Sequence, residues 1–137
     1  MSNQEYCEII ADEVRALEVA LDGPAYGWDP SALVDEDSQD QDFRGALDVL
    51  GLSHDVDPAD VFATYVNESV LEVIQWRADG YAPRVEWLRT YGGPGCRIYF
   101  DGNDYARIEV CSLGESDAVV SVYVPTLAAC VYEFADA

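Results

Sequence analysis

Lysine is absent from this chain of 137 residues, which has seven arginines and one histidine as its only basic side chains. With 27 acidic residues the formal net charge is −20 at pH 7. A surface of this sign repels the phosphates of nucleic acids and the headgroups of anionic membranes, so we expect neither as a direct partner. The charge favours a basic partner instead.

Long apolar runs and paired cysteines are missing too. No stretch approaches the roughly 20 apolar residues of a membrane span, and the N-terminus lacks the segments of a secretion signal, which predicts a cytoplasmic protein. The four cysteines, Cys7, Cys96, Cys111 and Cys130, form no C-x-x-C motif. With one histidine they predict neither a zinc site nor a disulfide framework, and we interpret them as buried or half-buried thiols.

Apolar residues make up half of the chain and aromatic residues 12%, which is enough to fold despite the charge. The length fits one domain, and we expect a single α+β domain over residues 1–137. Its acidic helical part should cover about 1–80. A small three-stranded antiparallel sheet and a short closing helix should cover about 92–137.

Helical periodicity is clearest in residues 4–21, where apolar side chains fall on one face and acidic ones on the other. Gly23 and the proline after it should end this helix. The acidic stretch 28–42 is too polar for a strand and is expected to be a loop. It should lead into a short helix over 43–50.

A second long helix is predicted from Asp57, because Asp before Pro58 is typical of a helix N-terminus. We expect this helix to run to about Arg77 and to bury its apolar residues, namely Val61, Phe62, Tyr65, Val66, Val70, Val73 and Trp76.

From Gly92 the period changes to the alternation of half-buried strands, separated by turns rich in Gly, Asp and Ser. Pro125 should then open a helix through Phe134. One face of the predicted sheet should be apolar and carry Ile98, Phe100, Ile108, Val110, Val120, Val122 and Val124. The other face should show Arg97, Tyr99, Tyr105, Arg107, Glu109 and Tyr123.

Motifs for catalysis or for a cofactor are not found. An EF-hand loop started at Asp35 or Asp40 places Ala46 or Gly51 where a glutamate is needed. His54 lies in a polar turn, and we reject a Cys96–His54 nucleophile pair because a glycine-rich turn before a strand explains Cys96. We therefore expect no enzyme activity, no metal and no cofactor.

Two surfaces are candidates for binding a partner. Helical spacing of carboxylates can imitate a row of phosphates, and this acidic surface comprises Glu5, Glu8, Asp12, Glu18, Asp22, Asp35, Glu36, Asp37, Asp40 and Asp42. The second is the outer face of the sheet, because Tyr and Arg are enriched at protein interfaces; it comprises Arg97, Tyr99, Tyr105, Arg107 and Tyr123. Alternatively, Arg97 and Arg107 pair with Glu109, or a helix covers this face.

The segment from Leu88 to Gly102, "LRTYGGPGCRIYFDG", resembles a Thr-Gly-Gly-Pro…Arg-Ile segment of small phage and mobile-element proteins. Tyr91 departs from that pattern by separating the threonine from the glycines. The resemblance implies a phage-like origin and a character similar to anti-CRISPR and anti-restriction inhibitors, several of which imitate DNA. It assigns no functional residue. The matching residues are Thr90, Gly92, Gly93, Pro94, Arg97 and Ile98.

These features favour a non-enzymatic inhibitor that blocks a basic nucleic-acid-binding protein, such as a CRISPR effector or a restriction enzyme, through an acidic, DNA-mimicking surface. Two alternatives stay open. The protein could be an immunity protein that neutralises a basic nuclease toxin. It could also be a salt-adapted acidic domain without a mimicry role, since high Asp and no Lys suit that class too. Homodimerisation is compatible with each.

Overall fold

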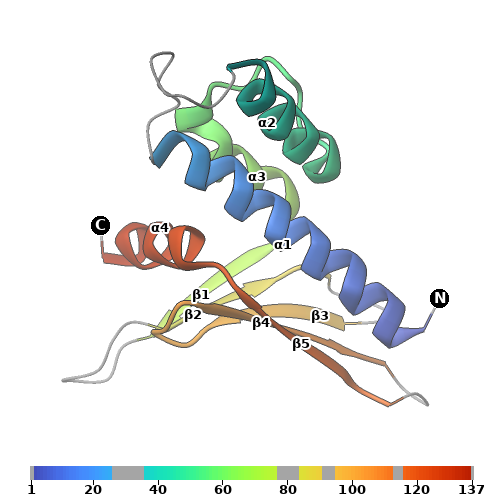
Figure 1. Cartoon of the computed structure of the whole chain (residues 1–137). Coiled ribbons are helices and arrows are strands. Elements are labelled where there is room, and N and C mark those ends of the chain that lie inside the picture. Colours follow the sequence, from blue (N-terminus) through green and yellow to red (C-terminus); the bar gives the residue numbers. More distant parts are fainter. Residues whose placement is uncertain (1, 26–35, 77–83, 91–94, 113–115, 137) are drawn as a thin grey trace.

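The computed structural model of the chain describes residues 2–25, 36–76, 84–90, 95–112 and 116–136, with backbone alone at 23–25, 36–41, 76, 135 and 136. Within these ranges it is an α+β fold (Figure 1). The helical elements are α1 (Asn3–Ala25), α2 (Glu36–Leu50), the 3₁₀ helix η1 (Pro58–Asp60), α3 (Val61–Ser69) and α4 (Pro125–Asp136). The strands are β1 (Glu72–Trp76), β2 (Arg84–Leu88), β3 (Gly95–Phe100), β4 (Tyr105–Cys111) and β5 (Ala118–Tyr123).

The strands form one antiparallel sheet in the order β1-β2-β3-β4-β5, so each strand pairs with its neighbour in sequence. Helix α1 crosses one face of this sheet over β4 and β5, and α4 packs on the same side against β2 and β4 (Figure 1). Helix α2 lies on α1, away from the sheet. The described helices therefore form a layer on one face of the sheet and leave its other face open.

The core fills the space between the helical layer and the sheet. Alternation along β3 and β4 buries Ile98, Phe100, Ile108 and Val110 completely, as predicted. Val122 and Val124 are also buried, and Val120 is half-buried against the same cluster. Trp87 of β2 packs edge-on against Phe100, with 4.9 Å between ring centroids. The predicted apolar face of the sheet is thus confirmed.

Five strands replace the three that were predicted, and the helix expected from Asp57 to Arg77 is wrong in its second half. Asp57 does begin a helical segment, since its carboxylate accepts a hydrogen bond from Ala59 N. Helix α3 ends at Ser69, however, and Val70 is extended (φ −105°, ψ 122°). The next residues form β1, because a run rich in β-branched residues gains a full ladder of pairing with β2.

Two further boundaries differ from the sequence prediction. Helix α1 continues past Gly23 to Ala25, and α2 begins at Glu36 rather than at residue 43. Acidic residues are favoured in a first helical turn, because they complement the partial positive charge of the helix N-terminus. That preference explains the earlier start of α2. The rest of the predicted acidic loop before Glu36 lies outside the described residues.

Single side chains were misassigned as well. Ile9, expected on the apolar face of the first helix, is 48% exposed. Cys7 and Cys96 are buried and Cys130 is half-buried, in line with prediction, whereas Cys111 is exposed on the outer face of β4. Trp76 is at the end of β1, and its side chain is outside the described part.

A buried ion pair joins the helical layer to the sheet. Arg89, directly after β2, donates from Nη1 to Glu13 Oε1 of α1 at 2.9 Å, and only 12% and 16% of these side chains are exposed. Tyr65 of α3 donates to the same carboxylate oxygen at 2.8 Å and also contacts Arg89. Burial raises the pKa of Tyr65, so its hydroxyl stays protonated and can donate.

Removal of one partner should test this cluster. We expect Glu13→Ala to lower the free energy of unfolding by about 3–5 kcal/mol, because it leaves the Arg89 guanidinium buried without a counter-charge. The double variant Glu13→Leu/Arg89→Met should recover much of that loss. Urea denaturation measures both, with Asp12→Ala, an exposed change one residue away, as the control that should alter stability by less than about 0.5 kcal/mol. Equal losses at residues 12 and 13 would contradict the assignment.

Candidate protein-binding surfaces

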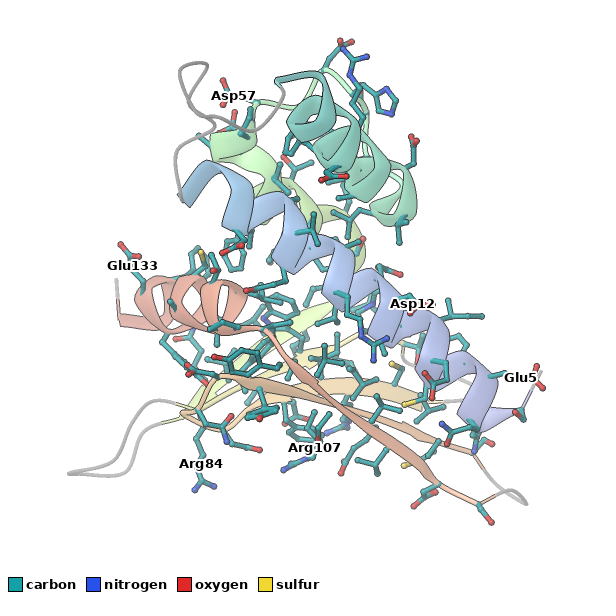
Figure 2. The ribbon with its side chains drawn as sticks, in the orientation of Figure 1. Glu5, Asp12, Asp57, Arg84, Arg107 and Glu133 are labelled. Carbon is teal, nitrogen blue, oxygen red and sulfur yellow. The ribbon has the colours of Figure 1, made fainter. Side chains whose placement is uncertain are left out.

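The helical layer carries most of the exposed negative charge that the structure describes. We call the exposed carboxylates of α1, α2, η1 and α3, and of the turn between α2 and η1, the acidic layer. It consists of Glu5, Glu8, Asp12, Asp42, Asp48, Asp55, Asp57, Asp60 and Glu68. Across the same described helices, only Arg15 and Arg44 are exposed arginines. Figure 2 shows Glu5, Asp12 and Asp57 on this side of the molecule and Arg84 and Arg107 projecting from the sheet on the opposite side.

Helix α1 presents the most regular part of the acidic layer. Glu5, Glu8 and Asp12 are exposed at successive helical turns, as their spacing predicted. Gln4 donates to Glu8 at 2.9 Å, and Arg15 pairs with Asp12 at 3.0 Å in a solvent-exposed contact. A single exposed ion pair neutralises little of this row.

Glu18 and Asp22 do not belong to the exposed surface on which the sequence placed them. Both are half-buried against the N-terminus of α4. The Glu18 carboxylate accepts hydrogen bonds from Thr126 N at 3.0 Å and Leu127 N at 2.7 Å, and Asp22 accepts from Thr126 Oγ1 at 2.9 Å. The Glu18 carboxylate satisfies free N–H groups of α4, and both carboxylates complement the dipole of that helix. They hold α4 in place.

Of the five acids predicted between residues 35 and 42, Asp42 is exposed at the surface of α2. Asp35 lies outside the described residues. Glu36, Asp37 and Asp40 belong to the backbone of α2, and their side chains lie outside the described part.

Sequence reasoning missed the acids in the last turn of α2 and in the segment that follows it. Asp48 lies 2.6 Å from His54 Nε2, and the turn and η1 beyond it add Asp55, Asp57 and Asp60. Their signal was present, because an acid-rich turn between two helices is exposed almost by necessity.

The outer face of the sheet brings together all five residues predicted for the second surface. Tyr99 pairs with Arg107 across β3 and β4, and Tyr105 pairs with Tyr123 across β4 and β5. Arg97 lies on the same face, opposite Glu109. None of the described helices covers this face, so the interpretation of a helix-covered surface is wrong for the described part of the chain.

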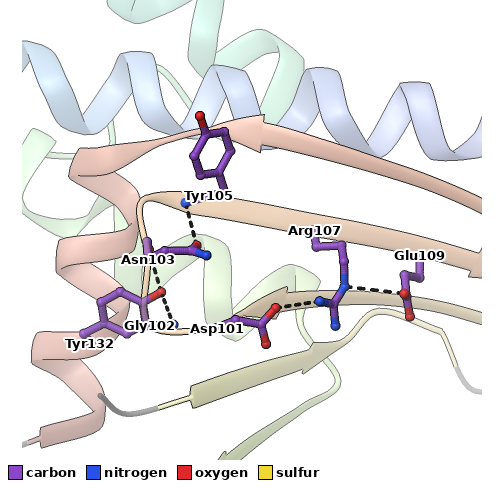
Figure 3. Close-up of polar contacts among 7 residues, drawn as sticks. All are labelled: Asp101, Gly102, Asn103, Tyr105, Arg107, Glu109 and Tyr132. Carbon is purple, nitrogen blue, oxygen red and sulfur yellow. Dashed lines mark hydrogen bonds and ion pairs between the residues drawn. The ribbon is translucent and has the colours of Figure 1, made fainter. Parts of the chain in front are cut away.

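Arg97 and Arg107 on this open face are held by carboxylates. Arg107 forms ion pairs with Asp101 at 2.7 Å and with Glu109 at 3.4 Å, the second of which is long for a hydrogen bond (Figure 3). The Arg107 guanidinium also stacks over the Tyr99 ring, 4.5 Å from its centroid. Arg97 pairs with Glu86 of β2, and this hydrogen bond raises the pKa of Arg97. The predicted partner of Arg97, Glu109, is therefore not the one that it binds. Sequence reasoning missed Glu86, because β2 was not foreseen.

The turn between β3 and β4 is fixed from the helical layer. Tyr132 of α4 accepts a hydrogen bond from Gly102 N at 2.8 Å and donates to Asn103 O at 2.7 Å (Figure 3). The Asn103 side chain accepts from Tyr105 N at 3.0 Å. Gly102 has φ +87°, a conformation that favours glycine. These contacts position Asp101 and Tyr105 at the end of the open face.

Chemistry beyond binding finds little support in the side chains described. No three or more His, Cys, Asp or Glu side chains among them are grouped to hold a metal ion. Burial raises the pKa of the Cys96 thiol to about 12, which keeps it protonated near neutral pH. His54 is exposed and contacts Asp48.

Comparison with protein-family models, with curated proteins and with solved structures finds no match to this chain. In the part of the chain that the structure describes, none of the helices has both the length and the apolar character needed to cross a membrane.

The role of Glu18 leads to a stability prediction. Glu18→Ala should lower the free energy of unfolding by about 1–2 kcal/mol, because it removes a charged acceptor from two N–H groups at the start of α4. The exposed Glu8→Ala on the same helix is the matched control and should have a much smaller effect. Thermal unfolding followed by circular dichroism compares the two. A Glu18 variant as stable as the Glu8 variant would show that the cap contributes nothing.

Proposed function

We propose that the protein is a non-enzymatic inhibitor of the anti-CRISPR or anti-restriction kind, which binds a basic nucleic-acid-binding protein through the acidic layer in place of nucleic acid. The observation that carries this proposal is the segregation of charge. In the described part of the chain, the nine exposed carboxylates of the acidic layer share their helices with two exposed arginines, whereas Arg97 and Arg107 of the open sheet face are paired with carboxylates. A groove that binds phosphates would therefore meet the helical side first.

Spacing of the carboxylates supports competition with phosphates. Residues three and four apart on a helix rise by about 4.5 and 6 Å, while duplex DNA presents one phosphate charge per roughly 1.7 Å of its axis. One row on α1 is thus sparser than DNA. Helix α2 adds Asp42 and Asp48, and the segment before α3 adds Asp55, Asp57 and Asp60, so that the layer as a whole has more carboxylates than the row on α1.

The resemblance of residues 88–102 to phage and mobile-element proteins is consistent with this class of inhibitor. Absence of lysine means that almost no positive charge weakens the field of the acidic layer. Electrostatic steering of this type raises the association rate and weakens as salt increases. The inhibitor should therefore lose affinity steeply between about 50 and 200 mM salt.

A competition experiment with a charge-matched control tests the proposal. DNA binding by a panel of CRISPR effectors, restriction enzymes and basic nucleases is measured by fluorescence polarisation, with and without the protein, at the two salt concentrations. We compare two variants that each lose three negative charges. One changes the acidic layer and is Glu8→Gln/Asp42→Asn/Asp60→Asn. The other changes exposed acids outside the helices and is Glu72→Gln/Asp104→Asn/Asp117→Asn.

For a susceptible target, the acidic-layer variant should inhibit at least about tenfold more weakly than the parent, a loss of about 1.4 kcal/mol. The control variant should stay within about threefold, because global charge alone changes the field at the interface only modestly. Equal inhibition by both variants would contradict a role for the acidic layer. If the protein blocks no target and unfolds when salt is withdrawn, the carboxylates would instead be an adaptation that keeps the domain folded at high salt.

A further inference from the structure

We propose that the open face of the sheet pairs with the same face of a second copy of this chain, so that two sheets form a sandwich with the acidic layers on the outside. This inference does not depend on the proposed function, because it concerns the opposite side of the molecule. It rests on exposed apolar side chains, on the signs of the charges around them, and on the net charge of the chain.

Apolar and aromatic side chains gather at the β4–β5 end of the open face. Tyr105 and Tyr123 are cross-strand partners with 5.4 Å between ring centroids, and they are 49% and 61% exposed. Val119, opposite Glu109 on the same face, is 53% exposed. Two large aromatic rings beside a β-branched residue are the kind of patch that anchors protein interfaces.

Charges around this patch occur in both signs and are already neutralised. Arg107 is stacked on Tyr99 and paired with Asp101, and Arg97 is paired with Glu86. A two-fold axis brings a surface against itself, so a dimer face has to be complementary to its own copy. Rows of Arg and carboxylate meet this condition, because a small shift places each arginine of one copy near a carboxylate of the other.

Among the surfaces that the structure describes, the net charge favours the open face as the one that contacts a second copy. Two chains of −20 repel each other, and the acidic layer cannot face its own copy. Facing open sheets place the acidic layers at the two ends of the dimer, the largest separation that the fold allows. A strongly basic partner would meet Arg97 and Arg107 here, and a polyanion would meet Glu86, Asp101 and Glu109. A second copy is the partner of matching chemistry.

Salt should affect this contact in the opposite direction from the binding of a basic partner. Screening weakens the repulsion between two acidic chains, so the dimer should become tighter as salt rises. Sedimentation equilibrium of the full chain at increasing concentration and at about 50 and 500 mM salt measures this. We expect a monomer–dimer equilibrium whose dissociation constant falls several-fold at the higher salt.

Paired substitutions locate the contact. Val119→Glu/Tyr123→Glu adds two charges to the open face and should raise the dissociation constant at least about tenfold. The control Ile9→Glu/Val49→Glu adds two charges at apolar positions of α1 and α2 that are 48% and 55% exposed, and it should leave the constant within about threefold of the parent. A milder variant, Val119→Thr/Tyr123→Thr, has β-branched residues suited to a strand at both positions and should also weaken the dimer.

Three outcomes would overturn this inference: a monomer at every concentration and salt, a dimer that persists in both open-face variants, or a dimer that the α1 and α2 control abolishes. Circular dichroism of each variant confirms that the fold is retained. Failure of this inference can be distinguished from failure of the proposed function. Open-face variants that become monomeric should still inhibit a target that binds the acidic layer.

Discussion

Directional polar contacts within an apolar core position the helical layer on the sheet, and the ion pair of Glu13 with Arg89, completed by the hydroxyl of Tyr65, is the one that joins α1, α3 and the end of β2. Apolar packing could hold α1 against the sheet at several registers, because a hydrophobic face is not directional. A buried carboxylate that must reach one guanidinium allows only one. The pair therefore sets where α1 and α3 lie relative to the end of β2, and the exposed faces of these helices follow from it.

The two sides of the molecule differ because helices and strands separate charge differently. In α1 and α2 the helical period buries apolar residues and turns a row of acids to solvent. In β3 and β4 the two-residue period turns Arg, Tyr and Glu outward together, where cross-strand neighbours neutralise one another. Because most of the described arginines lie in or beside the strands, the acids of the helical layer have few positive charges near them to balance their negative charge. One side can attract a basic surface, while the other can meet a neutral one.

Sequence patterns predicted the last three strands within about 92–124, the final helix and both faces of β3 to β5, because alternation over six residues is a strong local signal. They failed at β1, since residues 72–76 continue an apolar pattern that also fits a helix and become a strand only by pairing with β2. Glu18 was wrongly predicted to be on the exposed surface, because its environment also depends on a segment that is distant in the sequence. Its position on the helical wheel is polar, and its partners at Thr126 and Leu127 are about a hundred residues away.

Folding itself makes use of only some of the carboxylates. Glu13, Glu18 and Glu86 are buried or half-buried, and each has a cation or backbone N–H groups as partner. The acidic layer has few such contacts, and its mutual repulsion opposes the compact state. Folding does not account for this charge, and both explanations weighed for it, a basic partner or a concentrated salt solution, act outside the chain. Dissolved ions screen all exposed carboxylates alike, whereas a partner depends on where each of them lies.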